Sequence, residues 1–406
     1  MRSVVASALI VTLMGDYGAA PAWAEGQRIV DTDLVRVRVE TVASGLDHPW
    51  GLALLPDGRF LVTERNSGQL RIGTQIGELS EPVEHVPDVY RYQGPDELSQ
   101  GGLFHVALHP DFARNRLVYL SFSQPSSEGA GTALARGKLN ESGGAPSLDD
   151  VEVIYSMNVH DSSGMHFGGR FVFEPRTNNI LLSIGDRQMM SRAQDLTDHA
   201  GSIIRITDEG HTPPDNPFVG QEQKSELIYS SGHRNIQGMA IASRTGDLWV
   251  NDRGPMGGDE INLIKPGLNY GWPIQTGGAD SSGAPIGKGA YVEGMQPPVH
   301  IWPQTVAPSG LAIYDSGQFS MWSGDLLHGG LAAHGLVRTR IQNGKVTADE
   351  LIPLDRRIRD VQLAADGAIW LVTDDERGEV MRLVPQAPEA TGFAPGPPGY
   401  GGGINK

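Results

Sequence analysis

The sequence repeats a two-strand pattern six times, and this repeat limits the possible folds more than any other feature of the chain. Each copy contains an apolar run typical of a strand, a turn, and a second apolar run. In the first copy, the turn Pro56-Asp57-Gly58 separates the runs Gly51 to Leu55 and Arg59 to Thr63. Pro, Asp and Gly favour tight reversals because they fix or permit the required dihedral angles. The six turns have their apices at Pro56, Pro110, Pro175, Ser243, Asp315 and Ala365.

The spacing of these turns predicts the architecture. Successive apices are 54, 65, 68, 72 and 50 positions apart, which accommodates a four-stranded blade and its loops. A ring of blades protects the sheet edges that a linear array would expose. We therefore expect an all-β protein, a six-bladed β-propeller of four-stranded antiparallel blades, with one domain over residues 30–385. The competing fold, a pair of β-sandwiches, does not explain a repeat of this period.

A strand near the N-terminus is expected to close the ring. Residues 34–42 alternate apolar side chains, such as Val37 and Val39, with polar ones, such as Arg38, as a strand with one buried face does. This segment lies outside the six copies of the repeat. It is therefore free to pair with residues 379–383 and to complete the last blade.

The two ends of the chain differ in composition from the repeat region. Arg2 precedes an apolar stretch from Val4 to Met14, and Ala22-Trp23-Ala24 fits a signal-peptidase site. Residues 1–24 are thus predicted to be a signal peptide that exports the chain to the periplasm, or secretes it. The alternative, a membrane anchor, conflicts with an apolar run far below the ~20 residues that span a bilayer. No transmembrane segment is expected in the mature chain, and residues 386–406, rich in Pro and Gly, are predicted to be a flexible tail.

The composition excludes several classes of protein. The chain has no Cys, so disulfide scaffolds, thiolate metal sites, iron–sulfur clusters and cysteine nucleophiles are excluded. The formal net charge of -16 argues against a general attraction to nucleic acid or to anionic lipid. A small anion would need a local cluster of basic residues.

Two loops of the repeat region carry residues suited to binding. The segment 232–238 places Arg234 and Asn235 immediately before a strand, at a blade end where loops from all blades converge. The segment 252–260 is rich in Gly and ends in the carboxylate pair Asp259-Glu260. Carboxylate and carbonyl oxygens together form the environment that Ca²⁺ prefers. Taken alone, this second loop is better explained as an ordinary turn with solvated acidic residues.

Nine motifs accompany the repeat in chain order. They are Gln100-Gly101-Gly102 with His109-Pro110-Asp111-Phe112, His166-Phe167-Gly168-Gly169-Arg170, Gly185-Asp186, Asp215-Asn216-Pro217, Gly232-His233-Arg234-Asn235, Gly254-Pro255 with Gly258-Asp259-Glu260-Ile261-Asn262, Asn269-Tyr270-Gly271-Trp272-Pro273, Trp302 with Thr305-Val306-Ala307-Pro308-Ser309, and Arg357-Ile358-Arg359-Asp360-Val361. In these motifs the sequence resembles the soluble pyrroloquinoline quinone (PQQ) dependent sugar dehydrogenases, the glucose/sorbosone or aldose sugar dehydrogenase family. The resemblance extends from about Leu46 to Val384 and implies the same six-bladed propeller.

The resemblance implies a binding site for PQQ, a flat ortho-quinone with three carboxylates. Arg234, Arg357 and Arg359 match the family's PQQ-contacting arginines, and a guanidinium is suited to pairing with a carboxylate. Asn235 and Gln100 match polar contacts at the quinone edge. Arg357 and Arg359 are two positions apart, so on a strand both point to the same side. Without the other motifs, a solvated β face would explain this pair equally well.

The resemblance further implies that His166 is the catalytic base. An unperturbed imidazole titrates near pH 6.5, so it can take the proton from an anomeric hydroxyl while hydride leaves that carbon for the quinone. A buried, hydrogen-bonded structural histidine is the alternative. On the substrate side the resemblance places Arg253 and Trp302. The Trp302 ring either faces the sugar or packs in the core.

Two Ca²⁺ ions follow from the same resemblance. One would bridge PQQ and the main-chain carbonyls of Gly254 and Pro255, where it would act as a Lewis acid on the quinone oxygen. The second, a structural ion, would use Glu260 and the carbonyl of Tyr270.

The sequence departs from the family at three positions. Met165 stands where some glucose-oxidising members have an Asp before the catalytic His, and Arg253 stands where such members have Gln. Ala332 falls at the position of the family's PQQ-contacting Lys. These changes put the identity of the sugar in doubt. They also predict weak PQQ binding, unless Arg338 or His334 replaces the missing charge.

Three functions remain open from the sequence. The first is a periplasmic dehydrogenase that uses PQQ and Ca²⁺ to oxidise the anomeric carbon of aldose sugars to lactones, and passes electrons to an exported cytochrome or quinone. The second is a calcium-dependent lactonase-type hydrolase, which requires Asp, Glu and Asn side chains converging on the propeller axis. The third is a propeller that has lost its cofactor and only binds a ligand.

Overall fold

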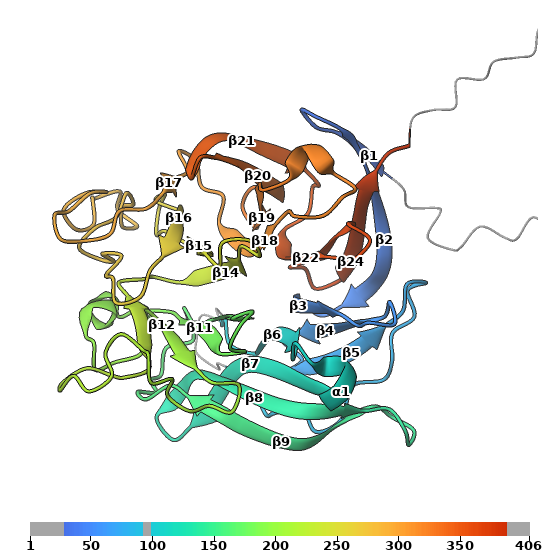
Figure 1. Ribbon diagram of the computed structural model, residues 1–406, viewed down its shortest axis with the longest axis horizontal. Coiled ribbons are helices and arrows are strands. Elements are labelled where there is room, and N and C mark those ends of the chain that lie inside the picture. Colours follow the sequence, from blue (N-terminus) through green and yellow to red (C-terminus); the bar gives the residue numbers. More distant parts are fainter. Residues whose placement is uncertain (1–27, 92–98, 388–406) are drawn as a thin grey trace, which may run out of the picture.

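A computed structural model describes residues 28–91 and 99–387 of the chain, and it confirms the predicted β-propeller. Six antiparallel sheets, here blades 1 to 6, are arranged around a central axis (Figure 1). The first strands of the blades, β3, β6, β10, β14, β18 and β22, contact one another in a closed ring. The predicted signal peptide, and the tail from residue 388 onward, lie outside the described residues.

The strands follow the chain from blade to blade. Blade 1 contains β3 (Pro49–Leu54), β4 (Phe60–Glu64) and β5 (Gln69–Gly73); blade 2 contains β6 (Leu103–Leu108), β7 (Leu117–Ser126), β8 (Gly129–Asn140) and β9 (Ser147–Ser156); blade 3 contains β10 (Gly168–Phe173), β11 (Ile180–Ile184), β12 (Ser202–Ile206) and β13 (Ile228–Ser231). Blade 4 contains β14 (Ile236–Ile241), β15 (Leu248–Asp252), β16 (Glu260–Ile264) and β17 (His300–Ile301); blade 5 contains β18 (Pro308–Ile313), β19 (Leu326–Gly330), β20 (Gly335–Gln342) and β21 (Lys345–Pro353); blade 6 contains β22 (Ile358–Leu363), β23 (Ile369–Thr373), β24 (Gly378–Pro385), β2 (Arg36–Leu46) and β1 (Arg28–Asp31). The described helices are short: α1 (Phe112–Asn115) and the 3₁₀ turns η2 (Met190–Gln194) and η3 (Ser320–Trp322).

All six predicted turns lie between the first and second strands of a blade, but two blades depart from four strands. Blade 1 has three, because the segment after β5 forms a single bridge, between Gly73 and Leu79, instead of a fourth strand. Ser80 and Val83 still donate backbone hydrogen bonds to β5, to the carbonyls of Ile72 and Leu70. Pro82, between them, has no N–H, so a regular ladder cannot continue there.

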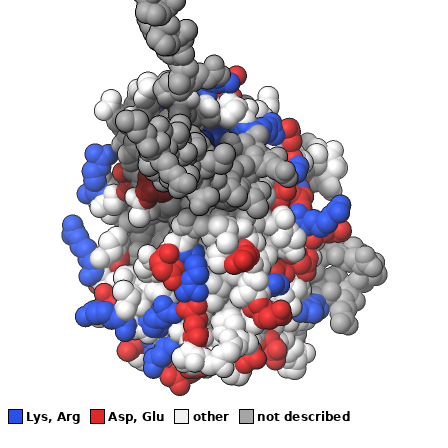
Figure 2. Space-filling model, turned by 90° about the vertical axis from the view of Figure 1, so that its right-hand side faces the viewer, with Lys and Arg blue, Asp and Glu red and all other residues white. Residues whose placement is uncertain are grey.

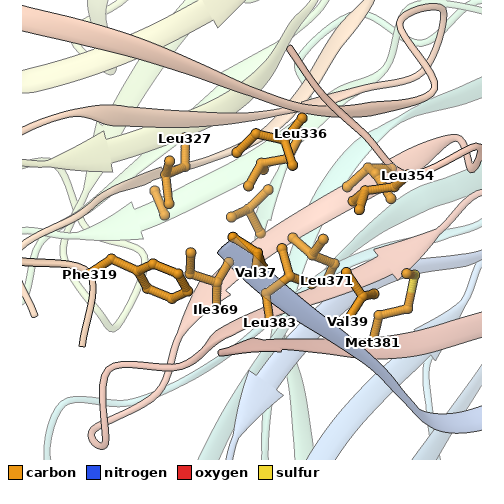
Figure 3. Close-up of a cluster of buried hydrophobic side chains, with 14 of the residues drawn as sticks. Val37, Val39, Phe319, Leu327, Leu336, Leu354, Ile369, Leu371, Met381 and Leu383 are labelled. Carbon is orange, nitrogen blue, oxygen red and sulfur yellow. The ribbon is translucent and has the colours of Figure 1, made fainter. Parts of the chain in front are cut away.

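Blade 6 is closed by the N-terminal segment, as the sequence predicts. β2 pairs with β24 in antiparallel register, with Val39 opposite Leu383, and β1 adds a fifth strand at the edge (Figure 1). Val37 and Val39 pack with Leu371 and Leu383 in a buried cluster that also includes side chains of blade 5 (Figure 3). The two ends of the propeller are thus held together in one sheet with a shared core.

Neighbouring blades are joined by hydroxyl groups on their second strands. Thr63 Oγ1 donates to the carbonyl of Phe104 in the next blade at 2.5 Å, and Ser121 Oγ donates in the same way to the carbonyl of Gly169 at 2.5 Å. These buried hydroxyl groups thus provide hydrogen-bond donors to backbone carbonyls of the next blade.

The hairpin geometry places one group of loops at one mouth of the channel. In an antiparallel pair, the beginning of the first strand lies beside the end of the second. Pro49 pairs with Glu64 in blade 1, and Gly168 pairs with Ile184 in blade 3. Residues that precede a first strand therefore meet residues that follow a second strand, and the candidate site is built from these positions together with the first two residues of several first strands.

Acidic and basic side chains are interspersed on the face of the molecule drawn in Figure 2. Within residues 28–91 and 99–387, none of the helices has the length and apolarity needed to cross a membrane.

Candidate functional site

A cavity of about 310 Å³ opens at this mouth of the propeller. Its lining comes from five of the six blades and consists of His48, Trp50, Arg65, Gln100, Phe104, Phe167, Gly168, Gln237, Arg253, Arg357, Arg359 and Asp374. Four arginines and one aspartate give this lining a formal charge of three positive, in a chain whose net charge is -16. The volume is within the range of small-molecule sites, and the charge favours an anionic ligand.

Asp374, which follows β23, holds three of the arginines. Its Oδ2 atom accepts from Arg359 at 2.6 Å and from Arg357 at 2.9 Å, and Oδ1 lies 3.5 Å from Arg65 Nη1. Burial opposes the ionisation of Asp374, but the arginines outweigh it and hold its pKa well below the ordinary value. The carboxylate is therefore charged at neutral pH, and it fixes guanidinium groups from blade 1 and blade 6 around one point.

Aromatic rings form part of the cavity wall beside these arginines. Trp50, Phe104 and Phe167 pack in sequence, with ring centroids 5.6 Å and 5.5 Å apart. The guanidinium of Arg359 lies 6.0 Å from the Trp50 ring centroid. A flat aromatic ligand would meet apolar surface and positive charge together.

His166 lies next to this lining and is held by Asp186. Its Nδ1 atom is 2.6 Å from Asp186 Oδ1, and the indole Nε1 of Trp272 donates to Asp186 Oδ2 at 2.7 Å. The other ring nitrogen, Nε2, has no hydrogen-bond partner in the described part of the chain. The His166 side chain is thus oriented on one side and free to accept a proton on the other.

The two charges in this pair are set by burial and by each other. Burial lowers the pKa of His166 below its ordinary value, and the hydrogen bond to Asp186 acts in the opposite direction. Burial disfavours the charged form of Asp186, but the hydrogen bond from His166, with Arg234 and Trp272, lowers the pKa of its carboxyl. At neutral pH the pair is a neutral imidazole beside a carboxylate.

The backbone around His166 is fixed by two residues that the sequence predicts as cofactor contacts. Gln100 Oε1 accepts from the His166 N–H at 2.9 Å, and Asn235 Oδ1 accepts from the Gly168 N–H at 3.1 Å. A side chain at Gly185 would collide with the His166 carbonyl and crowd Asn235, which explains the glycine before Asp186. Gln100 also lines the cavity, whereas Asn235 is 2% exposed and lies behind it.

Arg187 forms hydrogen bonds with the same loop from outside the cavity. Its buried guanidinium donates to the carbonyls of Ser163 and Met165, and it lies 3.6 Å from the ring centroid of Phe167. His166 itself has φ of +49°, an uncommon value for a residue with a side chain. The structure thus constrains the residues on both sides of His166.

A second, much smaller space of about 10 Å³ adjoins the cavity and is lined by Gly254 and Glu260, among others. It is large enough for a single water or ion. Burial, followed by the negative charge of Asp252, raises the pKa of Glu260 to about 8, and Asn262 Nδ2 donates to its carboxylate at 2.8 Å. A buried carboxylate with so little compensation suits a cation. The structure therefore brings together residues from both predicted calcium sites.

The predicted ligand Gly254 also has a protein partner. Arg234 Nη1 donates to the carbonyls of Arg253 and Gly254, in each case at 2.9 Å. A cation that binds the Gly254 oxygen would therefore compete with Arg234. Pro255 and Tyr270 lie on the same loops as the small space without lining it, and the Tyr270 carbonyl is 3.4 Å from Gln275 Nε2.

Trp302 and Ala332 are placed away from the cavity lining. Trp302 is 4% exposed and packs with Ile261 and Leu311, with its ring against His328 at 5.0 Å. This placement favours the core role over contact with a sugar. Ala332 is exposed, in the turn after β19.

The two residues named as replacements for the missing lysine are also engaged elsewhere. Arg338 is buried and forms ion pairs with Asp325 at 2.7 Å and Glu350 at 2.6 Å, so it cannot supply charge to the cavity. His334 lines a different opening, of about 590 Å³, together with Arg356 and other charged residues.

Sequence reasoning did not assign several residues of the site, among them the aromatic wall of the cavity and the polar residues Arg65, Asp186, Trp272 and Asp374. Asp186 and Trp272 lie within the motifs of the sequence analysis. However, the hydrogen bonds from His166 to Asp186 and from Trp272 to Asp186 join three separate loops. Arg65 and Asp374 each follow the second strand of a blade. That position, read across all six repeats, is the signal that would have identified them.

Comparison with known proteins gives a consistent result. Residues 46–382 match the glucose/sorbosone dehydrogenase family. The aldose sugar dehydrogenase YliI of Escherichia coli K12 is 39% identical over 355 residues, which are 86% of this chain and 93% of that protein. The crystal structure of the soluble aldose sugar dehydrogenase from Escherichia coli in the apo-form has a TM-score of 0.81 at 38% identity, covering 86% of this chain and 100% of that chain. The PQQ-bound aldose sugar dehydrogenase of Streptomyces coelicolor has a TM-score of 0.70 at 28% identity, covering 86% of this chain and 98% of that one. The chain belongs to the glucose/sorbosone dehydrogenase family.

Proposed function

We propose that this protein is a PQQ- and Ca²⁺-dependent dehydrogenase that oxidises the anomeric carbon of aldose sugars to lactones. The observation that carries the proposal is a cationic cavity, with a net lining charge of three positive, beside a histidine that has one bound and one free ring nitrogen. A tricarboxylate cofactor complements the cavity, and a sugar hydroxyl complements the free nitrogen. Membership of a family of sugar dehydrogenases supports the same assignment.

The residues present fit a flat tricarboxylate. Arg357, Arg359 and Gln100 line the cavity, and the aromatic wall that begins at Trp50 offers a face to a planar ring. When bound, PQQ would supply a two-electron acceptor that the side chains of this protein lack. The arginines would hold its carboxylates and orient it against the His166 loop.

His166 would act as the general base. Its Nε2 atom would accept the proton of the anomeric hydroxyl, which leaves more electron density on the carbon that loses hydride. Asp186 would keep the imidazole in the required tautomer and stabilise its charge once the proton has moved. Gln100 would hold the backbone of His166 and thereby the position of the ring.

Calcium would be held by the oxygen-rich loop after β15. The carbonyls of Gly254 and Pro255 are the ligands we assign to an ion beside the cofactor, and Glu260 and the carbonyl of Tyr270 are those of a second, structural ion, since Ca²⁺ prefers carboxylate and carbonyl oxygens. Their loops meet at the small space that also contains Arg253, which lines the main cavity as well. Positive charge at this boundary would favour electron density on an adjoining acceptor.

A lactonase-type hydrolase is less consistent with the site. Such an enzyme needs several acidic or amide side chains converging on a metal at the propeller axis. Across residues 28–91 and 99–387, no group of three or more acidic or histidine side chains is arranged to hold a metal ion. The charged side chains that line the cavity are instead four arginines and a single aspartate.

The location follows from the proposed chemistry and the N-terminal sequence. We infer export to the periplasm by residues 1–24, with electrons passed to an exported cytochrome or quinone. Fusion of residues 1–24 to a reporter that is active only outside the cytoplasm tests the export.

Reduction of an artificial dye tests the proposed activity. Purified apoprotein should reduce the dye with an aldose only after addition of both PQQ and Ca²⁺. Activity with a lactone in the absence of PQQ would indicate the hydrolase instead. Binding of an aldose without turnover, in the presence of both cofactors, would indicate a binding protein.

A further inference from the structure

Arg253 differs from the other arginines of the cavity because its guanidinium has no partner among the residues that the structure describes. Arg65, Arg357 and Arg359 all reach Asp374. Within residues 28–91 and 99–387, the Arg253 guanidinium forms neither a hydrogen bond nor an ion pair, and its carbonyl oxygen accepts from Arg234. The residue lies directly after β15 and lines both the cavity and the adjoining small space.

An unpaired guanidinium in this position is energetically unfavourable in the empty protein. Burial lowers the pKa of Arg253 to about 10, and the nearby cations Arg359, Arg234 and Arg357 add to this effect, while the negative charge of Asp259 opposes it in part without forming an ion pair. At neutral pH the group is nevertheless charged. A partly buried charge without a counter-ion destabilises a fold, so its natural complement is an anion that enters the cavity.

The positions that might supply a replacement for the family lysine do not reach the cavity. Ala332 is exposed and is not part of the lining. Arg338 forms two ion pairs, with Asp325 and Glu350, and His334 lines a separate opening. Among the described residues, Arg253 is the cavity arginine that has no carboxylate partner, whereas the other three share Asp374.

We propose that Arg253 binds a carboxylate of PQQ and supplies the positive charge that the family resemblance assigns to a lysine at position 332. Arg253, which the sequence analysis placed on the substrate side, therefore contacts the cofactor. This inference rests on the proposed function, because it takes PQQ as the anion that fills the cavity.

The main test is a titration of Arg253→Gln with PQQ in the presence of Ca²⁺, followed by quenching of the protein's tryptophan fluorescence. Loss of one charge-assisted hydrogen bond should raise the Kd by roughly 10- to 150-fold relative to the unsubstituted protein. Arg253→Lys keeps the charge and should recover part of the affinity. Ala332→Lys alone should change the Kd by less than about threefold, because Arg253 already supplies the charge.

The melting temperature of the apoprotein separates ligand binding from a structural role. Removing an uncompensated charge should leave the melting temperature of Arg253→Gln unchanged or raise it by about 1–2 °C. The rise in melting temperature produced by PQQ should shrink in the same variant. A lower melting temperature without PQQ would show that Arg253 supports the fold, and it would overturn the inference.

Arg356→Gln is the matched control. Arg356 is an arginine near the same mouth, but it lines the separate opening and pairs with Glu379 at 3.4 Å. Its replacement should leave the Kd for PQQ within about twofold, since the Arg356 side chain is exposed, is not part of the cavity lining and is screened by solvent. Equal weakening by Arg356→Gln and Arg253→Gln would reveal a general charge effect and would overturn direct contact.

The remaining outcomes are distinguishable. If the unsubstituted protein binds PQQ and Arg253→Gln binds it equally well, the inference about Arg253 is wrong and the proposed function stands. If the unsubstituted protein does not bind PQQ at all, the proposed function is wrong and the inference falls with it.

Discussion

The two sides of the cavity are built differently. On the side of blade 3, His166 is held by Asp186 through its ring and by Gln100 through its backbone, and Asp186 is itself held by Trp272. On the side of blade 4, Arg253 has no partner among the described residues, although it lies at the same mouth.

This difference indicates a division of labour. A group that moves a proton needs a fixed position and a controlled pKa before substrate arrives, so the protein completes its hydrogen bonds in advance. A group that binds an anion gains affinity when its charge is left unbalanced until the ligand arrives, at a cost to the stability of the empty protein. The predictions below test this division.

Replacement of His166 by Ala should have the largest effect. Loss of a general base typically lowers the rate by about 10²- to 10⁴-fold. The Kd for PQQ should be largely unchanged, because His166 is not among the residues that line the cavity. Dye reduction measures the first quantity and fluorescence titration the second. If the variant lost PQQ binding but turned over normally in the fraction that retained PQQ, the division between the two sides would be contradicted.

Replacement of Asp186 by Asn should lower the rate by about 10²-fold and shift its pH dependence. Burial lowers the pKa of His166, so activity should persist below pH 6.5 and be lost only as the pH falls through this depressed pKa. Asp186 raises that pKa, so its removal should move the acidic limb of kcat/KM to still lower pH. An acidic limb that moves upward would refute the assignment. Asp195→Asn, which alters an exposed carboxylate on the following loop, should leave the profile unchanged.

Removal of Ca²⁺ should have a moderate effect, on the stability of the protein. A chelator should lower the melting temperature of the protein by several degrees, because an ion bound only by the folded state stabilises it. Glu260→Gln should show a smaller drop in melting temperature on chelation than the unsubstituted protein, since its carboxylate is the charged ligand we assign to the structural ion. A variant that still responds to chelation as the unsubstituted protein does would show that Glu260 holds no calcium.

Replacement of Trp302 by Phe should have the smallest effect. Trp302 packs among apolar side chains, and its indole Nε1 is buried without a partner in the described part of the chain. The KM for the sugar should change by less than about twofold, and a modest loss of packing should be partly offset by removal of the unsatisfied donor. Steady-state kinetics provide the measurement. A rise in KM of about tenfold would indicate that Trp302 contacts the sugar and would contradict its assignment to the core.

The architecture follows from the sequence, and several of the residues proposed for the site could be named from it. Six copies of one hairpin with a period near that of a blade leave few alternatives to a ring, and the alternating strand at 34–42 has no other place to pair. The motifs around His166, Arg357 and Arg359 then identified residues that the structure places at one mouth. Their positions follow from the repeat, because each precedes or begins the first strand of a blade.

Only the tertiary structure decided how charges at that mouth are balanced. Asp374 and Arg65 are more than 300 positions apart, and Asp186 meets Trp272 across 86 positions, so no local pattern reports these contacts. The loss of a fourth strand in blade 1 likewise depends on one proline at one register position. Local periodicity fixes which residues form strands, whereas the partner of a charged loop residue depends on which blades the closed ring brings together.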